Sequence, residues 1–192
     1  MKNLFRLGGT LLLAATTMLA GPPLICQRVE IGKAQSLPWG LGSGWNTPDA
    51  HYEVNRLAGD TLAILTTRAP LNVRLETLRR AAIYAVKKEG LTEDLIARLL
   101  ARAADSEAAG KPEAMAWFDA GYFVEAMRQM AFIRKYDKVE RAQWKWQGDS
   151  RTFDGKPWID RAARLGAKGL EVALAKIEDM RRADLNPGVA TH

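Results

Sequence analysis

The sequence predicts an all-α protein of about six helices, packed as antiparallel helical hairpins, with no β-sheet. Apolar side chains recur at helical spacing in successive segments of residues 49–183, which we expect to form one domain. Glycine and proline separate these segments, for example at Pro70, Gly90 and Gly110. The 192 residues are 47% hydrophobic and 26% charged, a composition typical of a soluble globular domain.

Residues 1–20 have the features of a secretory signal peptide. Lys2 and Arg6 give a positively charged start, and an apolar stretch over 7–20 follows. Because this stretch is short for a membrane span, we favour a cleaved signal over an uncleaved anchor. Cleavage is expected in the range 20–26, with Ala20 as one candidate. The predicted location is therefore periplasmic or secreted.

Cys26 is a candidate site for a lipid anchor that would hold the protein at a membrane. It is the one cysteine of the chain, so an internal disulfide is excluded. Bacterial lipoproteins carry lipid on a Cys that follows a small residue, whereas Leu24 and Ile25 precede Cys26. Lipid anchoring at Cys26 is therefore the less favoured interpretation.

The charge of the chain is mildly basic. The formal net charge is +6, and removal of Lys2 and Arg6 with the signal would leave +4. Behind an export signal, this charge favours an anionic membrane surface or a cell-wall polymer over nucleic acid as a partner. An ordinary solvated surface is favoured over both.

Residues 21–48 are predicted to form an arm or loop. Glycine occupies every second position from Gly40 to Gly44, which gives no continuous apolar face. We favour packing of Trp39 and Trp45 onto the helices, because tryptophan carries a large apolar area. The alternative is an aromatic loop that stacks on a ligand such as a sugar ring.

Three amphipathic helices follow, over 49–67, 70–90 and 92–110. Asp49 is the expected N-cap of the first helix, and Pro70 fits the first position of the second. The inner face of the second helix is apolar: Leu71, Leu75, Leu78, Ala82 and Ala85. Its opposite side is charged: Arg74, Glu76, Arg79 and Arg80.

A fourth helix over 113–133 is apolar on all sides, which predicts a central position. It carries Asp119 and Glu125, which could act as general acid and base in a polysaccharide-cleaving enzyme. Six residues apart on a helix, however, the two carboxylates point in different directions. We therefore favour structural ion pairs, with Arg128 near Glu125, and Arg74 or Arg79 near Asp119.

Residues 136–156 lose the helical periodicity and are predicted to form an irregular connection. A possible interaction surface spans this region: Arg134, Lys135, Lys138, Arg141, Trp144, Lys145 and Trp146. Its tryptophans could lie at a lipid headgroup layer. A solvated loop with both tryptophans turned inward is the favoured interpretation. Two short helices over 157–165 and 170–182 follow, and 184–192 is predicted to be a disordered tail.

Two stretches resemble parts of tetratricopeptide repeats. Gly121-Tyr-Phe-Val-Glu-Ala126 is similar to the start of the second helix of such a repeat, and residues 158–165 are similar to its end. The resemblance implies a right-handed array of helical hairpins. The pattern of Leu37-Pro-Trp-Gly40 followed by residues 74–80 also resembles exported bacterial proteins with no assigned role.

The residue patterns predict no catalytic, metal or cofactor site. His51 and His192 are the two histidines, and neither belongs to a cluster with metal-ligand spacing. We therefore expect an exported, non-enzymatic protein that binds another protein through a helical-hairpin surface. Two alternatives stay open, an envelope enzyme or enzyme subunit using Asp119 or Glu125, and a membrane-surface binder using segment 134–151.

Overall fold

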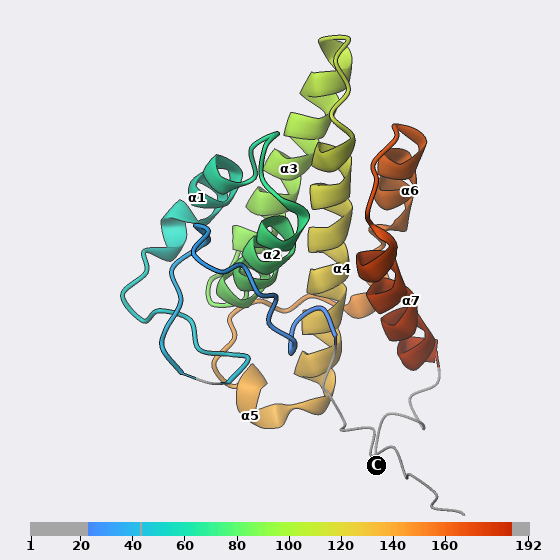
Figure 1. Cartoon of the computed structure of the whole chain (residues 1–192). Coiled ribbons are helices and arrows are strands. Elements are labelled where there is room, and N and C mark those ends of the chain that lie inside the picture. Colours follow the sequence, from blue (N-terminus) through green and yellow to red (C-terminus); the bar gives the residue numbers. More distant parts are fainter. Residues whose placement is uncertain (1–22, 43, 186–192) are drawn as a thin grey trace, which may run out of the picture.

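The computed structural model describes residues 23–42 and 44–185. Over these residues the protein is all-α, as predicted, with one isolated β-bridge between Trp39 and Pro48 and no strand (Figure 1). The predicted tetratricopeptide-like, right-handed arrangement stays a prediction. The helical elements in chain order are η1 (Val54–Arg56), α1 (Leu57–Ile64), α2 (Leu71–Ala85), α3 (Leu91–Ala108), α4 (Ala114–Tyr136), α5 (Lys138–Arg141), η2 (Ser150–Thr152), α6 (Lys156–Arg164) and α7 (Glu171–Leu185).

Helix α4 is the central element, as its apolar circumference predicts. It packs against α2 and α3 on one side and against α6 and α7 on the other (Figure 1). Its aromatic side chains Phe118, Tyr122 and Phe123 are fully buried. The apolar side chains of the other helices therefore meet on α4, in one continuous core.

Helix α2 is buried on its charged side as well as on its apolar side. Twelve of its fifteen residues are buried, and these include Arg74, Glu76 and Arg79. An amphipathic pattern alone would leave that side in water. Here the described part of the segment before α1, the arm (residues 23–42 and 44–48), runs across it (Figure 1).

The arm has no helix or strand, and several of its backbone groups bind side chains of α2 and α4. The amide of Val29 donates to Glu76, and the carbonyl oxygens of Leu37 and Trp45 accept from Arg80 and Arg79 respectively. Leu24, Ile25 and Leu37 enter the core. Buried backbone polar groups must find partners, and here charged side chains provide them.

The first helix begins later than predicted. Asp49 was expected to be its N-cap, but helical structure begins with η1 at Val54. The Asp49 carboxylate instead accepts from the amide of His51, and the Asp49 amide donates to the hydroxyl of Tyr84. These bonds hold the end of the arm against α2, so the helix starts only after the chain has left that contact.

Helices α6 and α7 form a hairpin beside α4. The turn between them contains Gly166 and Gly169 at φ +88° and +71°, where a side chain would be strained. Helix α7 continues to Leu185, two residues into the predicted disordered tail 184–192; residues 186–192 lie outside the described part of the chain. The predicted signal peptide over 1–20 also lies outside it.

The connection 136–156 is irregular apart from the short elements α5 and η2. Helix α4 runs three residues beyond the predicted limit, to Tyr136. Over the described residues, no helix is both long and apolar enough to cross a membrane.

Candidate functional site

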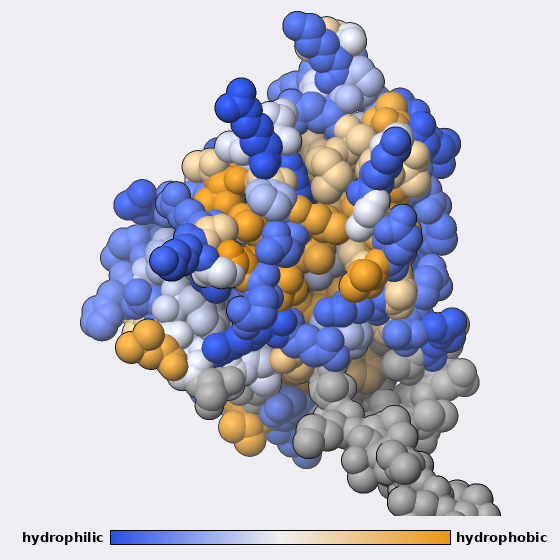
Figure 2. Space-filling model, viewed as in Figure 1, coloured by the Kyte–Doolittle hydropathy of each residue, from blue (hydrophilic) through white to orange (hydrophobic). Residues whose placement is uncertain are grey.

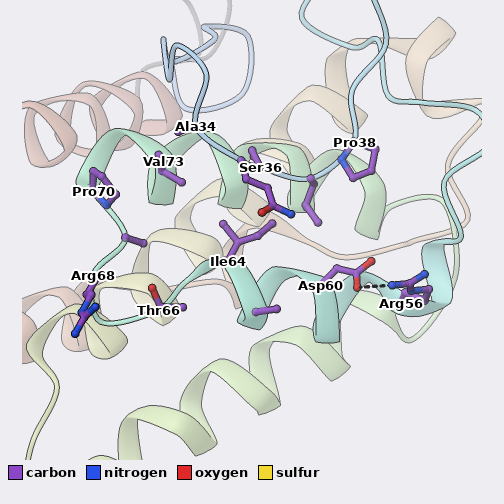
Figure 3. A pocket seen from close by; sticks show the side chains of 14 residues that line it. Ala34, Ser36, Pro38, Arg56, Asp60, Ile64, Thr66, Arg68, Pro70 and Val73 are labelled. Atoms are coloured by element: carbon purple, nitrogen blue, oxygen red, sulfur yellow. Dashed lines mark hydrogen bonds and ion pairs between the residues drawn. The ribbon is translucent and has the colours of Figure 1, made fainter.

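A groove lies between the arm, α1 and the start of α2. Its volume is about 550 Å³, and it is open to solvent on one side. One wall is arm residues 34–38, the other is α1, and the loop 66–70 closes one end (Figure 3). We call this cavity the arm groove.

The floor of the arm groove is apolar. Ile64 points from α1 towards α2, where Val73 faces the groove (Figure 3), and Ala69 also lines it. Apolar surface gathers over this side of the molecule and continues towards α4, with hydrophilic side chains around it (Figure 2). Removing such surface from water would favour binding of an apolar side chain here.

The two ends of the arm groove are charged. At one end Arg56 forms an ion pair with Asp60 at 3.2 Å, and Asp60 also accepts a hydrogen bond from Tyr52. At the other end Arg68 is exposed and has no ion-pair partner among the described residues. The groove therefore has two guanidinium groups and one carboxylate, and that carboxylate is already engaged by neighbours.

The structure brings Asp119 together with Arg74. Their side chains form an ion pair in which both are buried, and Arg74 also donates to the carbonyl oxygens of Thr66 and Ala69. The second carboxylate oxygen of Asp119, Oδ1, is buried without a hydrogen-bond partner. Burial raises the pKa of Asp119 to about 7, against the lowering effect of Arg74 and Arg102.

The Glu125 carboxylate joins three helices. It accepts from the amide of Gly155, at the start of α6, at 2.7 Å. It also forms an ion pair with Arg181 of α7, whose guanidinium binds Asp154 as well. Arg128, the partner suggested by the sequence, donates from its guanidinium to the carbonyl oxygen of Phe153 at 3.4 Å.

Glu76 organises a second buried cluster on α2. Arg79 and Arg80 both form ion pairs with it, at 2.8 and 2.7 Å. Burial alone would raise the pKa of Glu76, but the hydrogen bonds and charges of these arginines outweigh it and lower that pKa. Arg79 therefore binds Glu76 and the arm. Of the two arginines expected near Asp119, it is Arg74 that forms the ion pair.

Neither Asp119 nor Glu125 lines the arm groove. Each is fully buried and paired with a guanidinium group, and the two face different helices. Glycoside hydrolysis requires two carboxyl groups that flank a substrate from opposite sides. The geometry of these two residues does not provide that arrangement.

Trp39 is packed against α2 rather than presented to a ligand. Its ring meets Tyr84 edge to face at 6.1 Å, and the guanidinium groups of Arg79 and Arg80 lie 4.8 and 5.4 Å from its centre. Cation–π contacts of this kind hold an aromatic ring in one place. Trp45 is half-buried and packs against the core.

The residues of the predicted interaction surface over 134–151 do not lie together on one surface, because the tryptophans are buried and the lysines are exposed. Trp144 and Trp146 are 7% and 2% exposed and belong to the core, so they cannot reach a lipid layer. The residue between them, Lys145, is exposed, and the amides of Lys145 and Trp146 both donate to the carbonyl oxygen of Val86 at the end of α2.

The basic residues of the same segment stay on the surface. Lys135 and Lys138 are exposed, and Arg134 is half-buried and donates to Gln147. The side chain of Arg141 lies outside what the structure describes. Since both tryptophans are buried, the exposed part of the segment is a basic surface without either tryptophan.

Sequence reasoning missed the arm groove and Arg181. The groove forms because the arm packs across α2 and faces α1, a long-range arrangement that no local pattern encodes. Ile64 gave no separate signal, because it comes seven residues after Leu57 and so lies on the same side of α1 as that buried residue. Arg181 gave no signal, because one arginine of a terminal helix looks like any solvated cation.

Comparison of the chain with protein-family models, with curated proteins and with solved structures gives no match.

Proposed function

We propose that this chain is an exported, non-enzymatic helical protein that binds another protein, and that the arm groove receives an extended segment of that partner. The observation that carries the proposal is the groove itself: about 550 Å³, with an apolar floor around Ile64 and a cation at each end. Binding pockets in proteins commonly have this size and this mixture of apolar lining and few polar groups.

The charge of the groove specifies the partner further. Asp60 is satisfied by Arg56 and Tyr52, whereas Arg68 is exposed and unpaired among the described residues. A partner segment with one apolar side chain and a nearby carboxylate complements this arrangement. The apolar side chain would cover Ile64, and the carboxylate would pair with Arg68 as a charge-assisted hydrogen bond.

The groove is also held rigid on the arm side, which lowers the entropic cost of binding. Ser36 shares a hydrogen bond with Thr77 of α2 at 3.0 Å. The carbonyl oxygens of Leu37 and Pro38 accept from Arg80 and Tyr84. A wall fixed by side chains of a buried helix keeps its shape when a ligand enters.

Site-specific photo-crosslinking tests the proposal. A photoreactive residue at Ala63, exposed in the groove, is compared with one at Ala175, exposed on α7. We expect a discrete cross-linked species from Ala63 in the envelope or secreted fraction of the native organism, and none from Ala175. Cross-linking that is equal at both positions, or absent at both, would contradict the proposed site.

Binding of the identified partner then tests the charge argument. Arg68→Glu reverses the free cation of the groove, and Arg164→Glu makes the same change on exposed α6. We expect the first to weaken binding at least tenfold and the second to leave it unchanged. If both variants bind as the wild type does, the groove is not the binding surface. Recovery of the whole protein from the cytoplasm would refute export.

A further inference from the structure

We infer that Leu24 is the first residue that the folded domain needs, so that processing of the exported chain cuts before Leu24 and Cys26 is not the first residue of the mature protein. The inference rests on the export part of the proposed function. It goes beyond that function because it locates the processing site and decides between a free and a lipid-bearing N-terminus.

The side chains of Leu24 and Ile25 are part of the core. They are 1% and 0% exposed. In Figure 1 the beginning of the arm lies against the lower half of α4.

The backbone of these two residues is held as firmly as their side chains. The amides of Leu24 and Ile25 both donate to Oε1 of Gln129 on α4, at 2.9 and 3.0 Å. The carbonyl oxygen of Ile25 accepts from Arg79 on α2 at 3.0 Å. One dipeptide therefore links the two central helices of the fold.

A cut between Ile25 and Cys26 would remove all of these contacts. The core would lose two apolar side chains, and Oε1 of Gln129 would lose both donors in a buried position. The amide nitrogen of the same side chain, Nε2, is already buried without a partner, so the Gln129 side chain would be left without the hydrogen bonds it makes to the arm. Unsatisfied buried polar groups are strongly destabilising.

A lipid on Cys26 requires this cut, because the lipid-bearing cysteine becomes the first residue of a mature lipoprotein. A cut after Ala20, by contrast, leaves the dipeptide in place. It also leaves residues 21–23 between the new N-terminus and the core, so a charged amino group is not forced into it. The processing that the fold tolerates is therefore that of a secreted or periplasmic protein.

The full-length gene with its own leader tests this inference in a bacterial host, by intact mass and N-terminal sequencing of the accumulated protein. We expect a chain that begins before Leu24, carries no lipid and is recovered in the soluble envelope fraction after cell fractionation. Cys26→Ser should give the same N-terminus and yield. A mature chain that begins at acylated Cys26, or a Cys26→Ser variant that accumulates as precursor, would overturn the inference.

A second pair of full-length variants tests the role of the dipeptide in the fold. Ile25→Asp should lower the amount of soluble mature protein several-fold, whereas Lys33→Asp, at an exposed position of the arm, should not. Equal amounts would show that Ile25 is dispensable and would overturn the inference. An uncut chain in the cytoplasm would refute export as well, while an envelope protein that begins at Cys26 would refute only the inference about processing.

Discussion

Replacing Gly121 by alanine will separate α4 from α6, the two helices with the most extensive mutual contact. A Cβ at Gly121 would lie 2.6 Å from Cγ1 of Ile159 and 2.7 Å from the carbonyl oxygen of Gly155. The isoleucine side chain can rotate away, but the Gly155 carbonyl is backbone and is fixed by the amide of Gly155 binding Glu125. The helix must therefore move as a body.

Two effects of opposite sign determine the magnitude. Alanine is favoured over glycine within a helix by about 0.5–1 kcal/mol. Overpacking of a well-packed interface costs about 1–3 kcal/mol, and here the clash with backbone places the cost at the upper end. The net loss for Gly121→Ala is therefore about 2–2.5 kcal/mol. At roughly 2–4 °C per kcal/mol for a chain of this size, Tm should fall by about 4–10 °C.

Gly59 provides the matched control. It lies within α1, and a Cβ there would meet nothing within 4 Å. Gly59→Ala therefore keeps the helix-propensity gain without the clash, and it should raise Tm by a few degrees. Thermal unfolding followed by circular dichroism measures both variants under one condition. A Gly121→Ala protein as stable as the Gly59→Ala protein would show that α4 and α6 do not approach each other at Gly121.

Two further predictions concern the buried charges. Glu76→Gln keeps the shape of the side chain but leaves Arg79 and Arg80 without their counter-charge. We therefore expect the free energy of unfolding, measured with urea, to fall by about 3 kcal/mol. Asp94→Asn, which breaks an exposed pair, should cost less than about 1 kcal/mol. Asp119 has a folded-state pKa of about 7 against a usual 3.8, so between these pH values the folded chain keeps a proton that the unfolded chain has lost. The stability of the wild type should therefore fall, on the order of 1 kcal/mol per pH unit, relative to Asp119→Asn as pH rises from 4 to 7.

The outcomes that would contradict these two predictions are specific. Equal losses for Glu76→Gln and Asp94→Asn would mean that the Glu76 cluster is solvated. Parallel stability profiles for wild type and Asp119→Asn would mean that the pKa of Asp119 is not raised on folding.

The helices could be predicted from the sequence because their signals are local. Apolar spacing, together with Pro70 and Gly90, marked the segments that became α2 and α3. The apolar circumference of residues 113–133 indicated the centre of the molecule. These features depend on residues within a few turns of one another, which is the range over which sequence periodicity carries information.

The arm could not be placed in this way, because its partners are distant in sequence. Val29 bonds to Glu76, 47 residues away, and neither residue signals the other. The charged side of α2 looks like a solvent-facing side until the arm covers it. The arm groove exists only after that contact has formed, so the sequence could not predict it.

The partner of Glu125 illustrates a different limit. Spacing along α4 suggested Arg128, which lies one turn away. The structure gives Arg181, 56 residues away, because the α6–α7 hairpin returns beside α4. The Glu125 carboxylate also accepts a hydrogen bond from the amide of Gly155, so it lies where α6 begins. Helix α7 passes the same point and brings Arg181 to it.

The bonds between the Leu24–Ile25 backbone and Gln129 have a consequence for the order of events during synthesis. A ribosome makes residue 24 first, but its receptor on α4 appears 105 residues later. Until then the dipeptide has no place to dock, and its apolar side chains stay accessible to chaperones. Residues 24 and 25 are thus made early, but their contacts with α4 can form only after most of the chain has been made.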